Sequence, residues 1–266
     1  MGRSVALFGI PFHLKIKKNV FIPRAGLRYD VSDDVTVGYL YSRGFKPGGV
    51  DFRFFGGPPA AVPFQSESLD NHEIYTRSAF LDRRLKVNLS AFYYIFHDPQ
   101  IRGFGVSGLF GNGKQAIGYG GELEMTYEFL DGLTAIGGLG LLNTEITDPG
   151  PLNSAEKGGE LERAPNVTAN AGLSYVSPFG VDAALSMRYV GSSRPAYYEP
   201  ELDDYTVWDF AAGYEFSFSG GQSFRLDGFI KNIFDEIFLT EDFPTTGTRK
   251  AVGRPRTFGI TGTLRF

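Results

Sequence analysis

Three glutamates, Glu122, Glu124 and Glu128, lie close together in residues 121–129. Clustered carboxylates are groups that can perform general acid–base chemistry or bind a cation. Here they alternate with apolar residues, which places them on one face of an extended strand, with the first two as neighbours. Neither histidine nor cysteine accompanies them, so we interpret them as the polar wall of a water-filled interior.

Other chemistry-bearing motifs are weak. The three histidines, His13, His72 and His97, lack metal-ligand spacing, and we interpret His97 with Asp98 as a polar pair at a loop edge. Residues 103–108 match the dinucleotide pattern G-x-G-x-x-G, but no helical period follows, so we expect a mobile loop. There is no cysteine and no G-x-S-x-G motif. The sequence therefore predicts neither an enzyme nor a cofactor or metal site.

The composition favours strands and turns over helices. The chain has 35 glycines, 25 phenylalanines and 14 tyrosines but only 3 methionines. Its net charge of −4 gives no indication of nucleic-acid binding. It has no apolar run of about 18 residues, which excludes a membrane-spanning helix but not a membrane barrel, because half of each barrel strand faces a wet lumen.

Alternation of apolar and polar residues predicts long strands with one lipid-facing and one lumen-facing side. Each such run is about 10 residues long, the length that a tilted membrane strand needs. We expect the following residues to face lipid: Leu123, Met125, Tyr127, Leu173, Leu185, Trp208, Phe210, Ile260 and Leu264. We expect the following to face the concave side: Glu122, Glu124, Asn170 and Asp209.

Turns and loops alternate along the chain. Every second strand ends on an aromatic residue, and the set comprises Tyr29, Phe80, Phe129, Tyr175, Phe216 and Phe266. Short polar turns follow the first five, and long loops are expected between the other strand ends, at about 43–69, 102–114, 148–164, 191–203 and 235–255. Short turns on one side and long loops on the other are typical of an outer-membrane barrel with interfacial aromatic residues.

The predicted fold is therefore an all-β, antiparallel, up-and-down transmembrane β-barrel meander over residues 20–266. Residues 1–19 are expected to be an irregular segment, the remnant of a loop or strand. About eleven or twelve strands are expected, which suggests part of a larger barrel. The first residues do not resemble a secretory signal, so we expect the chain to be the back part of a longer protein.

Several short motifs resemble the C-terminal β-barrel of TonB-dependent outer-membrane receptors. The most specific is Tyr41-Ser-Arg-Gly-Phe-Lys-Pro-Gly-Gly49, which is similar to the opening of a large external loop in iron-complex receptors. Asn71-His-Glu-Ile-Tyr-Thr-Arg-Ser78 is similar to the family's Asn-x-Glu segment, although Tyr75 replaces the usual Gly and Arg77 the usual Lys. The remaining matches are Phe21–Tyr29, Ala164-Pro165-Asn166, Asn232-Ile-Phe-Asp-Glu236 and Gly253-Arg-Pro-Arg256.

The resemblance implies energised uptake of a scarce ligand, with a ferric siderophore favoured, across the outer membrane of a Gram-negative bacterium. In that family a barrel of about 22 strands surrounds an N-terminal plug. The implied partners are outer-membrane lipid, the plug and barrel half that this chain lacks, the TonB complex acting through that missing part, and the assembly machinery, which would read the terminal Phe266. The alternatives are a passive porin or adhesin-type barrel and a soluble all-β binding module.

The expected long loops are rich in aromatic and charged residues. Candidate ligand contacts at the outer mouth are Arg53, Phe54, Tyr197, Tyr198 and Glu241. These residues could instead pack the loops against one another, and the sequence alone does not separate the two interpretations.

Overall fold

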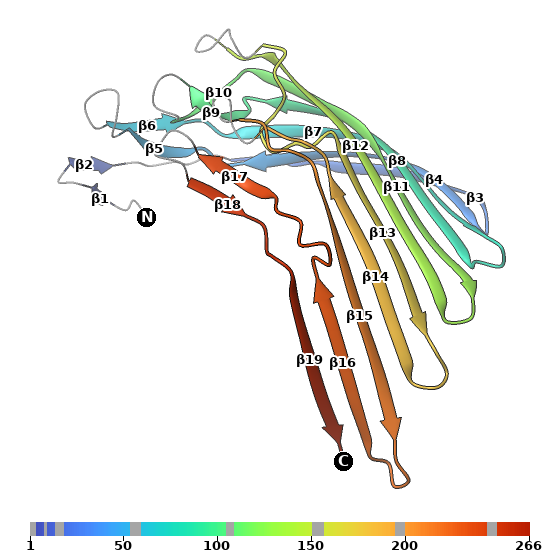
Figure 1. The fold of residues 1–266 in the computed structure, drawn as a ribbon. Coiled ribbons are helices and arrows are strands. Elements are labelled where there is room, and N and C mark those ends of the chain that lie inside the picture. The colour runs from blue at the N-terminus through green and yellow to red at the C-terminus, as the bar shows by residue number, and fades with distance from the viewer. Residues whose placement is uncertain are drawn as a thin grey trace.

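The computed structural model describes residues 4–7, 10–13, 19–53, 60–104, 109–150, 157–194, 200–243 and 249–266. In these ranges the chain forms strands, turns and bends (Figure 1). None of the described segments is a helix long and apolar enough to cross a membrane.

Eleven strands form one curved sheet in which each strand pairs antiparallel with the next (Figure 1). This arrangement confirms the predicted meander. The eleven strands are β3 (Arg24–Ser32), β4 (Val35–Lys46), β7 (Glu67–Phe80), β8 (Leu85–His97), β11 (Gln115–Leu130), β12 (Leu133–Asp148), β13 (Val167–Val176), β14 (Val181–Val190), β15 (Tyr205–Ser217), β16 (Ser223–Lys231) and β19 (Thr257–Arg265).

The connections at the two ends of the sheet differ, as predicted. Tight turns join the strands at one end, which we call the turn end, and longer segments join them at the loop end. Three of the long connections contain hairpins that the sequence did not predict: β5 (Gly49–Arg53) with β6 (Ala60–Phe64), β9 (Gln100–Phe104) with β10 (Leu109–Asn112), and β17 (Leu239–Phe243) with β18 (Arg249–Val252). Near the N-terminus, β1 (Ser4–Leu7) and β2 (Ile10–His13) form a fourth hairpin.

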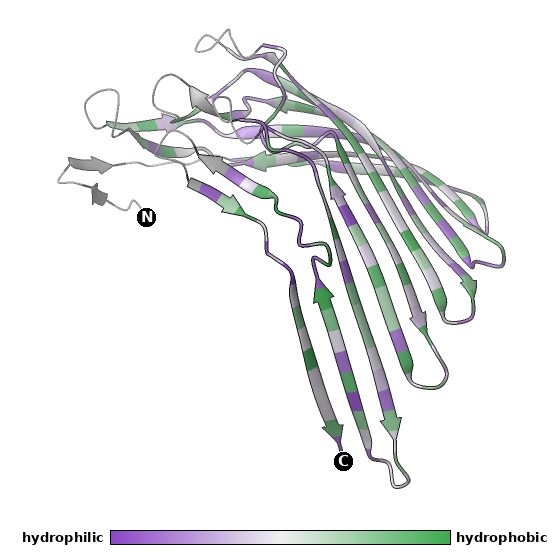
Figure 2. Cartoon of the chain, in the orientation of Figure 1, coloured by the Kyte–Doolittle hydropathy of each residue, from purple (hydrophilic) through white to green (hydrophobic). Residues whose placement is uncertain are grey.

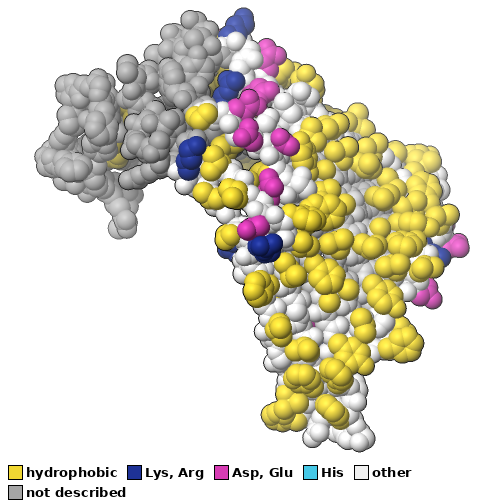
Figure 3. Space-filling view, viewed as in Figure 1, with side chains coloured by type: hydrophobic (Ala, Val, Ile, Leu, Met, Phe, Trp, Pro, Cys, Tyr) yellow, Lys and Arg dark blue, Asp and Glu magenta, His cyan; other side chains and the backbone are white. Residues whose placement is uncertain are grey.

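The register gives the sheet one outer and one inner face. Leu123 lies opposite Leu89 and Leu139, and Leu185 lies opposite Leu173 and Phe210. Because facing residues of paired strands share a side of the sheet, the residues expected to face lipid all lie on one face. Hydropathy alternates along the strands (Figure 2), and hydrophobic side chains cover a broad area of the viewed surface (Figure 3).

The two edge strands, β3 and β19, each have a single partner within the described part of the chain. Every residue of β3 and all but one residue of β19 are exposed. The structure is therefore an open segment of a barrel, which confirms the prediction of a partial barrel. The domain boundary near residue 20 stays a prediction.

Candidate functional site

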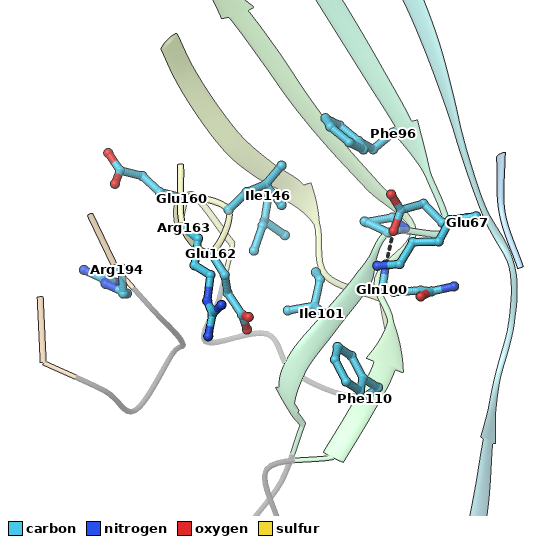
Figure 4. Close-up of a pocket in the computed structure, with 14 residues that line it drawn as sticks. Glu67, Phe96, Gln100, Ile101, Phe110, Ile146, Glu160, Glu162, Arg163 and Arg194 are labelled. Atoms are coloured by element: carbon cyan, nitrogen blue, oxygen red, sulfur yellow. Dashed lines mark hydrogen bonds between the residues drawn. The ribbon is translucent and has the colours of Figure 1, made fainter. Parts of the chain in front are cut away.

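A pocket of about 260 Å³ lies at the loop end of the inner face. Phe96 of β8 and Ile146 of β12 approach it from the sheet, and Ile101 of β9 lies between the two sides of the pocket (Figure 4). Ile101 and Ile146 are almost fully buried with Ala116 of β11, and Phe96 packs against this cluster. Because the open sheet has few fully buried side chains, this cluster is a local core that fixes the pocket floor.

Charged side chains reach the pocket from two sides, and acidic residues are present on both (Figure 4). From β7, the Glu67 carboxylate accepts a hydrogen bond from the Gln100 backbone N–H at 2.7 Å. From the 157–163 segment, the Glu160 carboxylate accepts one from the Asn166 side chain at 3.2 Å. These bonds hold the connections against the sheet and engage two of the three carboxylates that line the pocket, the third being that of Glu162.

Two cations on the pocket wall differ from the rest. Lys46 and Arg194 line the pocket, and both are exposed. Within the described ranges neither side chain has an ion-pair partner, whereas the third cation, Arg163, contacts Glu241 at 2.7 Å. The pocket therefore holds two cations beside the aromatic rings of Phe96 and Phe110.

The structure places only part of the predicted ligand-contact set. Phe54, Tyr197 and Tyr198 lie outside the described residues, and Arg53 is placed only as the last residue of β5. Glu241 of β17 reaches the pocket indirectly, through its ion pair with Arg163. Lys46 and Phe96 were not predicted as site residues, although Lys46 lies inside the motif that begins at Tyr41.

Contacts among the loops are also extensive. The Gln100 side chain donates to the carbonyls of Pro47 and Gln65, and the Asp51 carboxylate accepts from the Phe110 backbone N–H. The Asn112 side chain donates to the carbonyls of Gln65 and Asp98. Loop packing, the alternative interpretation of these segments, is therefore extensive in the described parts of residues 47–66 and 98–114.

Two other motifs from the sequence, the G-x-G-x-x-G pattern and the glutamates, have structural settings. Residues 103–108 lie at the β9–β10 connection, partly outside the described ranges, and the strand β10 follows where a dinucleotide site needs a helix. Glu124 accepts a hydrogen bond from Asn88 on the inner face. The described residues contain no group of three or more carboxylate or histidine side chains that could hold a metal.

The two motifs near the C-terminus meet each other at the loop end. Asn232 is almost fully buried, and its side chain donates to the carbonyls of Glu236 and Arg254. The Asp235 carboxylate accepts from the Arg256 backbone N–H at 2.8 Å. These contacts stabilise the connection between β16 and β19. Phe266 is 96% exposed, and its role in assembly stays a prediction.

The sequence is similar to known receptor proteins over most of its length. Residues 7–261 match the family model "TonB dependent receptor-like, beta-barrel". The metal-pseudopaline receptor CntO of Pseudomonas aeruginosa is 25% identical over 260 residues, which is 92% of this chain but only 33% of that receptor. The chain thus spans about a third of the length of this curated relative.

Solved structures share the fold. The ferric yersiniabactin uptake receptor FyuA from Yersinia pestis superposes with a TM-score of 0.76 at 23% identity, over 98% of this chain and 40% of that one. The closed form of the ferric-catecholate import receptor Fiu from K12 E. coli gives a TM-score of 0.70 at 19% identity, over 96% and 36%. With the family match covering nearly the whole sequence, the chain belongs to the β-barrel family of the TonB-dependent receptors, outer-membrane proteins of Gram-negative bacteria.

Proposed function

We propose that this chain forms the C-terminal part of a receptor barrel that imports a metal chelate, most simply a ferric siderophore. The pocket at the loop end carries this proposal. Lys46 and Arg194 supply positive charge, and Phe96 and Phe110 supply aromatic surface beside it. Anionic chelates with aromatic groups suit such a combination, because cations attract the anion and rings pack on its apolar parts.

Three relatives support this ligand class by name, since they are receptors for metal-pseudopaline, ferric yersiniabactin and ferric catecholates. Membership of the family favours a receptor without enzymatic activity over the passive porin and the soluble module. Because the chain spans only part of those receptors, we propose that a plug and the remaining strands complete it and that the TonB complex acts through the plug.

The test is uptake of radioactive iron supplied as a panel of ferric siderophores to cells that make the complete receptor. The double variant Lys46→Ala and Arg194→Ala should lower uptake of the recognised chelate about tenfold or more, since each tenfold in affinity is about 1.4 kcal/mol. Lys157→Ala is the control, because Lys157 is an exposed lysine of the β12–β13 connection, which also supplies Glu160 and Arg163 to the pocket, but does not itself line the pocket.

Two results would contradict the proposal. If the control lowered uptake as much as the double variant, the effect would come from general surface charge rather than from the pocket. If uptake persisted after the proton-motive force was collapsed, the barrel would be a passive channel.

A further inference from the structure

A compact polar cluster lies on the outer face, the side on which Leu89 and Leu123 point to lipid. It is centred on Asp70 of β7, which faces Arg43 of β4 and lies two residues beyond His72 on the same face. The register places Tyr41, His72, Tyr93, Tyr119 and Asn143 in one row of direct neighbours across five strands. Tyrosines near the loop ends of neighbouring strands on a barrel's outer face are typical of a membrane–water interface.

The cluster is tightly bonded. The Asp70 carboxylate accepts two hydrogen bonds from the Arg43 guanidinium, at 2.7 and 2.6 Å, and one from the Tyr41 hydroxyl at 2.7 Å. His97 Nε2 of β8 lies 3.0 Å from the same carboxylate. These contacts join three strands at their loop ends, and they leave Asp70 almost buried while Arg43 and His97 remain 36% and 42% exposed.

A charged group on the outer face is costly inside the hydrocarbon of a bilayer but not among the headgroups. The cluster lies on the loop-end side of the tyrosine row, so it belongs at headgroup level on the outer side of the membrane. Within the described residues, the Arg43 guanidinium donates only through Nε and one Nη2 bond, both to Asp70, which leaves three further N–H donors. A guanidinium with a fixed plane and free donors matches the geometry of a phosphate group.

We propose that Arg43 and His97, positioned by Asp70, form a binding site on the outer face for the phosphate-bearing headgroup of an outer-leaflet glycolipid. Asp70 orients the Arg43 guanidinium and the His97 ring, and it does not itself contact the lipid. The tyrosine row below the cluster packs against the acyl boundary of the same leaflet. This site is separate from the proposed ligand pocket, because the pocket lies on the inner face.

The first test measures bound lipid. The complete receptor is extracted from outer membranes in mild detergent, and co-purifying phosphorylated glycolipid per protein is quantified by native mass spectrometry. Arg43→Ala should lower bound glycolipid about fivefold or more, and Arg43→Lys should restore part of it, because the charge returns without the planar fork. Arg28→Ala is the control, since Arg28 also pairs with a carboxylate, Asp30 at 2.9 Å, but on the inner face.

Equal loss of bound glycolipid in Arg43→Ala and Arg28→Ala, or no loss in Arg43→Ala, would overturn the proposal.

A second measurement leaves the cluster intact. Spin labels at Gln115→Cys, opposite His97 in the register, and at Leu123→Cys report depth through collisions with a water-soluble nickel chelate and with oxygen. We expect the label at position 115 to collide mainly with the nickel chelate, as at headgroup level, and the label at position 123 to collide mainly with oxygen, as in hydrocarbon. Oxygen-accessible behaviour at both positions would place the cluster in hydrocarbon and overturn the site.

Discussion

Asn232 is the residue on which the connection between β16 and β19 depends most. Its side chain makes three hydrogen bonds, two as a donor to carbonyls and one as an acceptor from the Glu236 backbone N–H. One of these bonds reaches Arg254, 22 residues along the chain. Its backbone is also left-handed, with φ of 52°, a conformation that asparagine tolerates better than most residues. Asparagine therefore suits this position for two reasons: its side chain makes the three hydrogen bonds, and its backbone tolerates the left-handed conformation.

We expect Asn232→Ala to lower the free energy of unfolding by about 2–4 kcal/mol, because three backbone groups lose their hydrogen-bond partner and the left-handed backbone becomes strained. Urea unfolding of the detergent-solubilised receptor, followed by heat-modifiable gel mobility, measures this loss. The control is Asn88→Ala, which removes a single 3.2 Å bond to Glu124 on an exposed surface. Similar losses in the two variants would show that Asn232 does not hold the connection.

The sequence predicted the residue-scale chemistry unevenly. Strand parity placed Glu122 and Glu124 on the inner wall, because side-chain alternation is a local property. Parity could not reveal that Lys46 and Arg194 share a pocket, because that depends on how connections about 150 residues apart fold over the sheet. The bonds of Asn232 are equally non-local, and only the resemblance to the receptor motifs indicated that the residue mattered.

At the scale of the strand, alternation decides which substitutions the membrane tolerates. Leu185 on the outer face lies between Leu173 and Phe210, and its neighbour Ser186 faces Gly172 and Asp209 on the inner side. Adjacent residues of this strand therefore face different environments, lipid at Leu185 and water at Ser186.

Leu185→Arg should destabilise the folded barrel by about 2–4 kcal/mol, and Ser186→Arg should cost much less, because only the first places a charge in hydrocarbon. The measurement is the folded fraction of each variant against urea in lipid vesicles. If both arginines reduced the folded fraction alike, the assignment of outer and inner faces would be wrong.

Glycines on the inner face allow paired strands to approach closely. A Cβ at Gly120 would collide with the backbone carbonyl oxygen of Leu141 and lie 2.9 Å from the Phe92 ring. At Gly137, on the outer face, the nearest atom would be the Met125 methyl at 3.9 Å. The two glycines lie on paired strands but differ in the space around them.

Gly120→Ala should therefore cost about 1–3 kcal/mol, because backbone atoms rather than a flexible side chain must move. Gly137→Ala should change stability by about 0.5 kcal/mol or less. Thermal melting of the two variants in detergent separates these outcomes. An equal shift in both melting temperatures would mean that loss of glycine flexibility, rather than collision, controls the effect.

The sheet topology was predictable at the element scale because long alternating strands joined by short turns leave few other arrangements. The hairpins inside three long connections were not predicted. Their strands are only 4 or 5 residues long, too short for alternation to be distinguished from irregular loop sequence.

For the whole molecule, the direction of the two edge strands limits what can complete the barrel. β3 and β19 both run from the loop end to the turn end, because the eleven strands alternate in direction. Direct pairing of β3 with β19, within one chain or between two copies, would be parallel. An all-antiparallel closure therefore needs an odd number of additional strands, whose two outer strands run toward the loop end. The total is then even, as in bacterial single-chain barrels.

The whole-molecule prediction is that this sheet does not close on itself or on a second copy. Leu27 of β3 and Ile260 of β19 are 75% and 80% exposed on the outer face, so cysteines at these positions report contact between the edges. We expect Leu27→Cys combined in turn with Phe258→Cys, Ile260→Cys or Leu264→Cys to form no disulfide when the chain is produced alone in membranes. The positive control is Leu123→Cys with Leu139→Cys, which are direct neighbours on β11 and β12 and should cross-link if the sheet has formed. Edge disulfides as abundant as the control would show that β3 and β19 pair in parallel, and the barrel would then not need an odd number of additional strands. If the edge disulfides are absent while the control cross-links strongly, both edges remain unpaired in this chain. Unpaired backbone groups in lipid cost several kcal/mol each, so additional strands must then pair with both edges in the complete barrel.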